Sequence, residues 1–405
     1  MSIRVRTVRN TEELARAMGA IGHYFGWIPT AEQGESFLSY LPLDRMHAAF
    51  DDGRIIGGAG VYPFELTVPG GPLRCAGVTI VGVQPTHRRR GVLRRMMTAQ
   101  LADVRERGEP IAALWASEDT IYGRYGYGMA SQCVDITLPR DSAELRPGLP
   151  PREGQVRLVD HDEAMREFPR VYERLRRRST GFVLRTRDWW SKRNLDDTAE
   201  WRRGNAGPLN RALLELDGGP AGYALYRVAQ HQTEFKRSLR VIEAQGIDAR
   251  ATREIWRFLL AIDWMDEIEA RLLPVDHPLW QLVARPRFLG MKVHDGLWVR
   301  PIDIGAALSA RAYARDGRVT LEIVSDPLFE ENVGVWTIAD GVARRARRRP
   351  DVRLDVQALG SVYLGGFSFA ELARAERVEE AARGGLARAD DLFRTDAAPW
   401  CPEIF

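Results

Sequence analysis

Residues 78 to 128 read VTIVGVQPTHRRRGVLRRMMTAQLADVRERGEPIAALWASEDTIYGRYGYG, and this stretch decides how the chain folds. It opens with an apolar, β-branched run, Val78–Val83, which is typical of a buried strand. After Gly91, apolar residues recur at helical spacings of four, four and three, at Leu93, Met97, Leu101 and Val104. Gly108 is placed to end that helix, and Ile111–Trp115 is a second short apolar run. The stretch therefore predicts a strand, a loop, a helix and a strand.

The loop between the first strand and the helix carries four basic residues, His87–Arg90, followed by Gly91. The first N–H groups of a helix have no partners inside the helix, and the helix dipole is positive there. A glycine at this point lets an anion approach the backbone, and arginine matches the geometry of phosphate. The loop thus favours a phosphate site. A solvated arginine cluster on a surface helix is the alternative, and the loop alone does not separate the two. Neither a Walker loop nor a Rossmann fingerprint is present.

Arg88-x-x-Gly91 between a strand and a helix resembles the acyl-CoA pyrophosphate loop of the GNAT superfamily of N-acetyltransferases. Leu93 departs from that pattern, which has glycine or alanine there. The wider match, THRRRG followed by LWASE and IYGRYGYG, is similar to the Eis (enhanced intracellular survival) family. The resemblance extends to the chain length and the closing PWCPEIF. It implies an N-acetyltransferase that uses acetyl-CoA as co-substrate.

Composition sets broader limits on the chain. Of the 405 residues, 45% are hydrophobic and 28% charged, which is typical of a globular protein with more than one domain. No apolar run approaches the roughly 18 residues of a membrane span. The first residues, MSIRVRTVRN, lack an apolar signal core, so we expect a cytoplasmic protein. The 3 cysteines and 7 histidines show no metal-ligand spacing, and no metal is expected.

The pattern of elements appears twice. Hairpins around Asp51-Asp52-Gly53 and residues 69–72 precede the basic loop, and a similar order of strands and helices follows between residues 156 and 273. The second loop, Gly246–Ala251, lacks the arginine–glycine spacing and contains an acid. We therefore expect an α/β (α+β) fold with two tandem GNAT-like domains, residues 1–140 and 141–295, the second degenerate. The resemblance implies that residues 296–405 form a sterol-carrier-like α/β domain that supplies the terminal carboxylate.

The last domain gives a weaker signal. Helices are predicted at Ile304–Tyr313, Ser368–Ala375 and Val378–Arg383, and strands at Val319–Val324, Val333–Ile338 and Asp351–Val356. The run RRARRR, residues 344–349, has the composition of a nucleic-acid patch. Its alanine-spaced context instead favours a solvated helix face, and the net charge of +3 is too small to argue for nucleic acid.

The family pattern also assigns cofactor-binding residues. The pyrophosphate belongs on the backbone N–H groups of the loop and first helical turn, and the pantetheine arm belongs beside the end of the first strand. Two residues after the second strand would close over the arm. The residues assigned in this way are Arg88, Arg89, Arg90, Gly91, Val92, Leu93 and Arg94 for the pyrophosphate, Val81, Gly82 and Val83 for the arm, and Ser117 and Glu118 for its closure.

Two catalytic residues follow from the same resemblance. Tyr122 matches the general acid, because a phenol with a pKa of about 10 is protonated at neutral pH and can protonate a thiolate. The α-carboxylate of Phe405 matches the general base. A packed aromatic ring is the alternative for Tyr122, and a frayed tail is the alternative for Phe405. The apolar, stiff ending Trp400, Pro402, Ile404 and Phe405 favours a docked tail.

The sequence thus predicts transfer of acetyl groups to primary amines. By resemblance the substrates are aminoglycosides or other polyamines, modified at one or several positions, with protein lysines as an alternative, and the assembly is a homohexamer. A lipid or sterol carrier and a nucleic-acid binder are the competing hypotheses. An apolar cavity in the C-terminal domain would support the first of these, and salt-dependent DNA binding the second.

Overall fold

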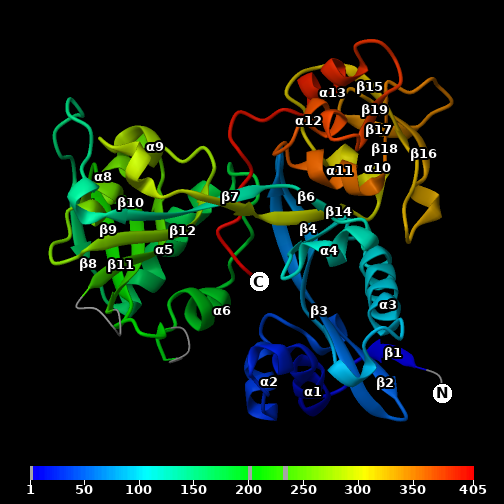
Figure 1. Cartoon of the computed structure of the whole chain (residues 1–405), viewed down its shortest axis with the longest axis horizontal. Coiled ribbons are helices and arrows are strands. Elements are labelled where there is room, and N and C mark those ends of the chain that lie inside the picture. The colour runs from blue at the N-terminus through cyan, green and yellow to red at the C-terminus, as the bar shows by residue number, and fades with distance from the viewer. Residues whose placement is uncertain (1–2, 199–202, 231–235) are drawn as a thin grey trace. The chain divides into compact units, whose positions relative to one another are not determined.

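The computed structural model describes residues 3–198, 203–230 and 236–405. The chain forms two compact units. The first unit contains Met1–Ser131, Leu297–Asp396 and Glu403–Phe405, and the second contains Gln132–Gly296 and Ala397–Pro402. Both have a mixed seven-stranded sheet, and the first also contains a five-stranded sheet built from the C-terminal part of the chain (Figure 1). The expected α/β class, with two similar sheets and a further C-terminal layer, is confirmed.

The sheet of the first unit has the strand order β1-β2-β3-β4-β5-β14-β6. Its strands are β1 (Arg4–Thr7), β2 (Met46–Asp51), β3 (Arg54–Val68), β4 (Gly71–Val83), β5 (Ile111–Trp115), β14 (Leu297–Pro301) and β6 (Gly128–Met129). The two predicted hairpins share one long strand, β3, which pairs antiparallel with β2 and β4. The helices of this part are α1 (Thr11–Gly22), α2 (Ala31–Phe37), α3 (Val92–Glu106) and α4 (Asp119–Tyr122).

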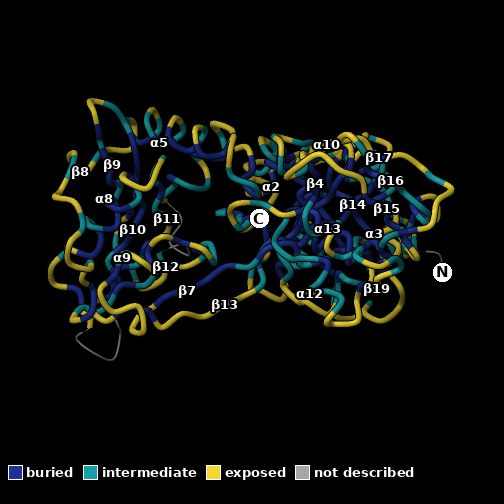
Figure 2. Tube along the Cα trace, turned by 90° about the horizontal axis from the view of Figure 1, so that it is seen from above, coloured by how far each residue is buried: buried dark blue, intermediate teal, exposed yellow. Residues whose placement is uncertain are grey.

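Helix α3 forms where the apolar spacing predicts it. Met97, Leu101 and Val104 are fully buried and pack in one cluster with residues of β3, β4 and β5. The helix ends at Glu106, and Gly108 follows with a φ of 66°, a left-handed conformation that suits glycine. The middle of the central strand β4, Cys75–Thr79, is buried, and the trace around the β4 label in Figure 2 is dark blue. The predicted strand–loop–helix–strand segment is therefore confirmed.

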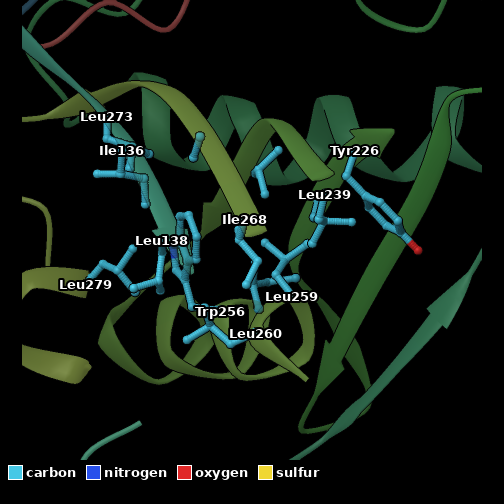
Figure 3. Close-up of a cluster of buried hydrophobic side chains, with 14 of the residues drawn as sticks. Ile136, Leu138, Tyr226, Leu239, Trp256, Leu259, Leu260, Ile268, Leu273 and Leu279 are labelled. Atoms are coloured by element: carbon cyan, nitrogen blue, oxygen red, sulfur yellow. The ribbon is translucent and has the colours of Figure 1, made fainter. Parts of the chain in front are cut away.

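The sheet of the second unit repeats this order as β8-β9-β10-β11-β12-β7-β13. Its strands are β8 (Gln155–Leu158), β9 (Asn210–Leu216), β10 (Gly219–Gln230), β11 (Arg237–Gly246), β12 (Glu267–Pro274), β7 (Gln132–Pro139) and β13 (Lys292–Asp295). Its helices are α5 (His161–Arg176), α6 (Arg187–Trp189), α8 (Ala249–Leu260) and α9 (Leu279–Leu282). Trp256, Leu259 and Leu260 of α8 are buried against Ile268 and Leu138 of the sheet (Figure 3).

The sixth strand of each sheet comes from an unexpected part of the sequence. β7 follows directly after the first unit's strands, yet it pairs with β12 and β13 of the second unit. β14 follows the second unit's strands, yet it pairs with β5 and β6 of the first. The sequence placed Gln132–Pro139 in residues 1–140 and Leu297–Pro301 in the C-terminal domain. The apolar pattern of a strand does not specify its partner, so this reciprocal exchange was not visible in the sequence.

The C-terminal layer differs from the prediction in several elements. It contains helices α10 (Ile304–Ala310), α11 (Val356–Tyr363), α12 (Phe369–Arg374) and α13 (Gly385–Phe393), and strands β15 (Arg318–Ile323), β16 (Gly334–Ala339), β17 (Val342–Arg345), β18 (Val352–Leu354) and β19 (Val378–Glu380). The helix predicted at Val378–Arg383 is wrong, because Val378–Glu380 pairs with β18. The helical face predicted for residues 344–349 is also wrong, because Arg344 and Arg345 pair with β16.

Candidate active site

The basic loop leads into a helix start that has no side-chain cap. The N-cap residue Gly91 has a φ of 76°, and within the described residues the start of α3 has no side-chain capping hydrogen bond. Arg89 also has a positive φ, of 62°. Because the first N–H groups of a helix lack intrahelical partners, those of Val92, Leu93 and Arg94 are available to an anion. This is the site that the arginine–glycine spacing predicts.

The side chains around this helix start divide into two groups. Arg88, Arg89, Arg90 and Arg94 are exposed, so their guanidinium groups can reach an anion at the loop. The side chain of Val92 is buried beside Met96 in the core under α3, and Leu93 packs against the same cluster. Val92 and Leu93 can therefore contribute only their backbone N–H groups to cofactor binding.

Strands β4 and β5 open into a fork beside this loop. They pair in parallel only from Cys75 with Ile111 to Gly77 with Ala113, although β4 continues to Val83. The ladder between β3 and β4 shifts register after Thr79, and Ile80 adopts a φ of 53°. We call the divergence beyond Gly77 the β4/β5 fork. An extended acyl-CoA arm can add to β4 there as an extra strand does, by hydrogen bonds to the backbone.

The predicted arm-binding residues lie beyond the opening of the β4/β5 fork. The Tyr24 hydroxyl donates a hydrogen bond of 2.8 Å to the carbonyl of Val83. Gly82 lies directly under α1, because a Cβ there would be 2.6 Å from Cα of Ile21. The start of the chain thus covers the end of β4 and fixes the position of Val81, Gly82 and Val83. The sequence did not indicate this role for Tyr24.

Tyr122 ends the short helix α4, just after the end of β5. Its ring is 7% exposed and packs edge-on against Tyr127 at 6.1 Å between centroids. Burial raises the pKa of Tyr122 to about 12, and a hydrogen bond with Ser117 partly opposes that rise. The phenol is therefore protonated at neutral pH. Ser117 and Glu118 are exposed, and Glu118 is the N-cap residue of α4.

The glycines of the YGRYGYG turn are needed because neighbouring residues pack too closely for a side chain there. A Cβ at Gly123 would lie 2.6 Å from Nε2 of Gln357, on α11 of the C-terminal layer. Side chains at Gly126 and Gly128 would collide with Arg300 and with the backbone of α11, respectively. The C-terminal layer therefore packs directly against the turn that carries Tyr122. In the sequence the glycine spacing was visible, but its partner was not.

The ring of Phe405 contacts two aromatic residues of β3, the strand next to β4. Its ring packs edge-on against Phe64 at 4.8 Å and against Tyr62 at 6.5 Å. The Phe64 ring in turn covers Gly77, where a Cβ would collide with it. Gly77 is the last paired residue of β4 before the fork. The ring of Phe405 is thus packed against β3, close to the point where β4 and β5 part.

Tyr122 and Phe405 approach the first sheet from opposite faces. Val61 shares a buried cluster with Tyr122, whereas the next residue, Tyr62, contacts Phe405. Consecutive residues of a strand project to opposite faces of the sheet. A thioester lying in the fork would therefore have the phenol on one side and the terminal residue on the other.

A chain of aromatic rings leads away from Phe405. Tyr62 packs against Tyr40 at 5.8 Å, Tyr40 against Phe37 at 5.3 Å, and Phe37 against Trp27 at 6.2 Å. The nearby Phe25 and Ile28 are 70% and 83% exposed. These ring contacts connect the segment from Trp27 to Tyr40 with the predicted site residue Phe405.

No group of three or more His, Cys, Asp or Glu side chains in residues 3–198, 203–230 and 236–405 has the arrangement of a metal site. Across the same ranges, no helix is long and apolar enough to cross a membrane.

Comparison with known proteins agrees with this geometry. Residues 4–130 and 181–301 match acetyltransferase (GNAT) domain families, and residues 304–402 match the sterol carrier protein domain family. An uncharacterized N-acetyltransferase of Streptomyces avermitilis is 36% identical over 97% of this chain and 96% of its own length. The N-acetyltransferase Eis of Mycobacterium tuberculosis is 36% identical over 84% of each chain. The crystal structure of Eis1 from Mycobacterium abscessus matches with a TM-score of 0.86 and 33% identity, over 99% of this chain and all of its own.

The fold, the fork and the uncapped basic loop define an N-acetyltransferase enzyme of the GNAT class. With these relatives matching across most of its length, the chain belongs to the Eis family of N-acetyltransferases.

Proposed function

We propose that this enzyme transfers the acetyl group of acetyl-CoA directly to primary amines of polyamine small molecules, aminoglycosides among them. The observation that carries the proposal is the β4/β5 fork, which lies beside an uncapped helix start and between Tyr122 and Phe405. An anion cradle and an open strand edge suit an extended acyl-CoA, whose pyrophosphate and amide-rich arm need those two partners.

Each cofactor-binding residue has a physical role in this proposal. The N–H groups of Gly91, Val92, Leu93 and Arg94 bind the pyrophosphate, and Arg88, Arg89 and Arg90 supply positive charge. Val81, Gly82 and Val83 pair with the arm, and a backbone N–H of this strand end polarises the thioester carbonyl. Ser117 and Glu118 close over the arm.

The chemical step needs one proton acceptor and one donor. The amine nitrogen attacks the thioester carbon, the carbon–sulfur bond breaks, and the amine loses a proton. In a chain that ends at Phe405, the α-carboxylate accepts this proton directly or through water. Tyr122 gives its proton to the leaving thiolate. The raised pKa of Tyr122, about 12, suits a donor that is fully protonated when the reaction begins.

The family resemblance suggests the substrate class, and the surroundings of Phe405 support it. Protonated amines are attracted to aromatic faces and to carboxylates, and the ring chain from Trp27 to Tyr62 supplies the former. The terminal carboxylate and the buried carboxyl group of Glu403 supply negative charge. A flexible polyamine can present more than one amine to such a site, so acetylation at several positions is expected. Lysine side chains of proteins are the alternative acceptors, and family resemblance is the basis for proposing a homohexamer.

The C-terminal layer gives no support to lipid carriage as a second function. Arg311 is 2% exposed, and its guanidinium donates to the carbonyls of Tyr363, Ala312 and Phe393. Its charge lies over the rings of Tyr313 and Phe393. A buried cation among these groups is a poor lining for a sterol or acyl chain.

An amine panel tests the proposed activity. Purified enzyme with acetyl-CoA should release thiol with an aminoglycoside and with a linear polyamine, and more slowly with a lysine-containing peptide. Mass spectrometry of the products counts the acetyl groups. Acetyl-CoA binding without thiol release from any amine would contradict the proposal.

Two variants test the catalytic assignments. Tyr122→Phe should lower kcat by about 10²–10⁴-fold without changing acetyl-CoA affinity, because only the transferable proton is lost. Adding a short Gly-Ser extension after Phe405 should lower kcat to a similar degree, because it replaces the carboxylate by an amide. Unchanged turnover in either variant would remove that residue from the mechanism.

A further inference from the structure

The second sheet contains the same kind of strand divergence as the first. β11 and β12 pair in parallel from Ser238 with Glu267 to Val241 with Ala270, and both strands continue beyond these pairs. The register of β12 against β7 shifts after Ala270, and Leu272 has a φ of 56°. We call this opening the β11/β12 fork. It occupies the same place in the strand order as the β4/β5 fork.

A segment of the chain itself fills the β11/β12 fork. The segment Ala397–Pro402, here called the tail, belongs to the second unit. The indole N–H of Trp400 donates a hydrogen bond to the carbonyl of Leu272, inside the fork. A pocket at this place is lined by Val241, Ile242, Glu243, Ala244, Ala270, Arg271, Leu272, Leu273, Trp400 and Pro402. The tail thus occupies the position that an acyl-CoA arm would take in a functional GNAT unit.

The backbone of the tail is tied at two further points. The backbone N–H of Trp400 donates to the carbonyl of Thr180 at 2.9 Å, and the backbone N–H of Ala398 donates to Oδ2 of Asp276 at 2.8 Å. A Cβ at Gly181, where φ is 100°, would lie 2.5 to 2.8 Å from backbone atoms of Trp400. The Trp400 ring also packs edge-on against Phe182 at 5.3 Å. Gly181 is therefore the residue that allows the tail backbone to come this close.

We propose that the β11/β12 fork is a binding site for the chain's own tail, with Trp400 as its anchor, and that this anchoring positions the carboxylate of Phe405. The second part rests on the function proposed above. Phe405 lies only three residues beyond Pro402, so fixing Pro402 restricts the positions that the backbone of Phe405 can take. Trp400 and Gly181 are positioning residues, because they act through Phe405 and do not touch the reacting atoms.

Two readouts test the tail site independently. The Cys401 thiol is 1% exposed in the docked tail, so its rate of alkylation by N-ethylmaleimide, measured by peptide mass spectrometry, reports release of the tail. Steady-state kinetics report the position of the carboxylate. Trp400→Ala should raise the alkylation rate at Cys401 about 10-fold or more, as expected for loss of a buried hydrogen bond and its ring packing. It should lower kcat by roughly 10- to 100-fold at unchanged KM for acetyl-CoA.

Matched variants separate docking from general stability. Trp400→Phe keeps an aromatic ring but removes the indole N–H, and should give intermediate values for the Cys401 alkylation rate and for kcat. Trp264→Ala removes a tryptophan of the second unit that is 82% exposed, and should match wild type. Gly181→Ala leaves Trp400 intact and should reproduce the effects of Trp400→Ala. If Trp400→Ala does not fold, Gly181→Ala provides the same test.

A double variant distinguishes failure of this inference from failure of the proposed base. If both changes act through one carboxylate, Trp400→Ala should add no further loss of kcat to the chain extended after Phe405. Faster Cys401 alkylation with unchanged kcat would overturn the positioning role. Wild-type alkylation in both Trp400→Ala and Gly181→Ala would overturn the tail site itself. If the extended chain has wild-type kcat, the proposed base fails, and the alkylation rate still decides whether the tail site exists.

Discussion

The two sheets of this enzyme have the same strand order, but the helices that follow their central strands begin differently. In the first unit, α3 begins at a glycine without a side-chain cap and follows a run of exposed arginines. In the second unit, the Asp248 carboxylate caps α8 by accepting a hydrogen bond of 2.8 Å from the N–H of Ala251. A carboxylate bonded to the helix start takes the place of a phosphate and repels another anion. The N-cap residue and the run of arginines therefore both distinguish the two loops.

The two forks show the same contrast. The β4/β5 fork opens beside the uncapped helix, whereas the β11/β12 fork contains Trp400. Two sheets with the same strand order therefore differ at both features that a cofactor would contact, the start of the helix and the fork. The comparison teaches that strand order alone does not identify the binding copy. The copy suited to a cofactor is identified by its N-cap residue and by whether its fork is filled.

The largest expected effect concerns the separate stability of the two units. In the first unit, Arg300 and Asp326 form a fully buried ion pair at 2.7 Å, and Asp326→Asn would leave the buried guanidinium without its counter-charge. We expect the first unit to lose about 3–5 kcal/mol, with no loss in the second. Peptide-resolved hydrogen exchange under mild denaturant measures both units in one sample.

A surface variant is the control for that measurement. Glu322→Gln breaks the exposed pair with Arg353, whose side chain is 43% exposed, and should cost less than about 1 kcal/mol. Equal loss of protection in both units with Asp326→Asn would show that they unfold as one.

Acid should act on the second unit through His277. Burial lowers the pKa of His277 to about 3, and its Nδ1 accepts a hydrogen bond from the Leu279 N–H at 3.0 Å. The unfolded histidine has a pKa of about 6.5, so unfolding takes up a proton below that pH. Stability from this group is complete above pH 6.5 and declines as the pH falls toward 3. The loss should reach about 3 kcal/mol near pH 4.

His277→Gln should make the stability of the second unit less dependent on pH. The difference in stability between variant and wild type, measured by chemical denaturation from pH 8 to pH 4, isolates the contribution of the histidine from that of the carboxyl groups. A difference that stays constant with pH would rule out His277 as the cause.

Copying the second unit's N-cap into the first should weaken cofactor binding. Gly91→Asp places a carboxylate at the start of α3, and we expect acetyl-CoA to bind about 10- to 100-fold more weakly. Gly91→Asn is the matched control, because asparagine also tolerates a positive φ and caps helices but adds no charge. Calorimetric titration at two salt concentrations measures both, and the gap between them should narrow in high salt. Equal acetyl-CoA affinities of the two variants would show that this loop does not bind the phosphate groups.

The reverse change should have the smallest effect. Asp248→Ser keeps a capping side chain on α8 and removes its charge, so stability should change by less than about 0.5 kcal/mol. Because the tail fills the β11/β12 fork, the number of acetyl-CoA molecules bound per chain should stay the same. Binding of a second acetyl-CoA by this variant would show that the N-cap alone blocks the second unit.

The sequence predicted those features that depend on neighbouring residues. The strands, α3 and the basic loop follow from local apolar spacing and from Gly91, and they are confirmed. α11 was missed because its residues, VQALGSVY, directly continue a strand and form only a short apolar run. The exchange of β7 and β14, the link from Phe405 through Phe64 to Gly77, and the tail in its fork depend on contacts distant in sequence. No local pattern encodes such contacts.

The exchanged strands also constrain the order in which the protein can fold during synthesis. The first sheet needs β14 between β5 and β6, but the ribosome makes all of Gln132–Gly296 before Leu297. At about 5–20 residues per second, that interval lasts roughly 10 to 30 s. During this time β5 has an unpaired edge in the newly made chain, which is where chaperone binding or pairing with another nascent chain would begin.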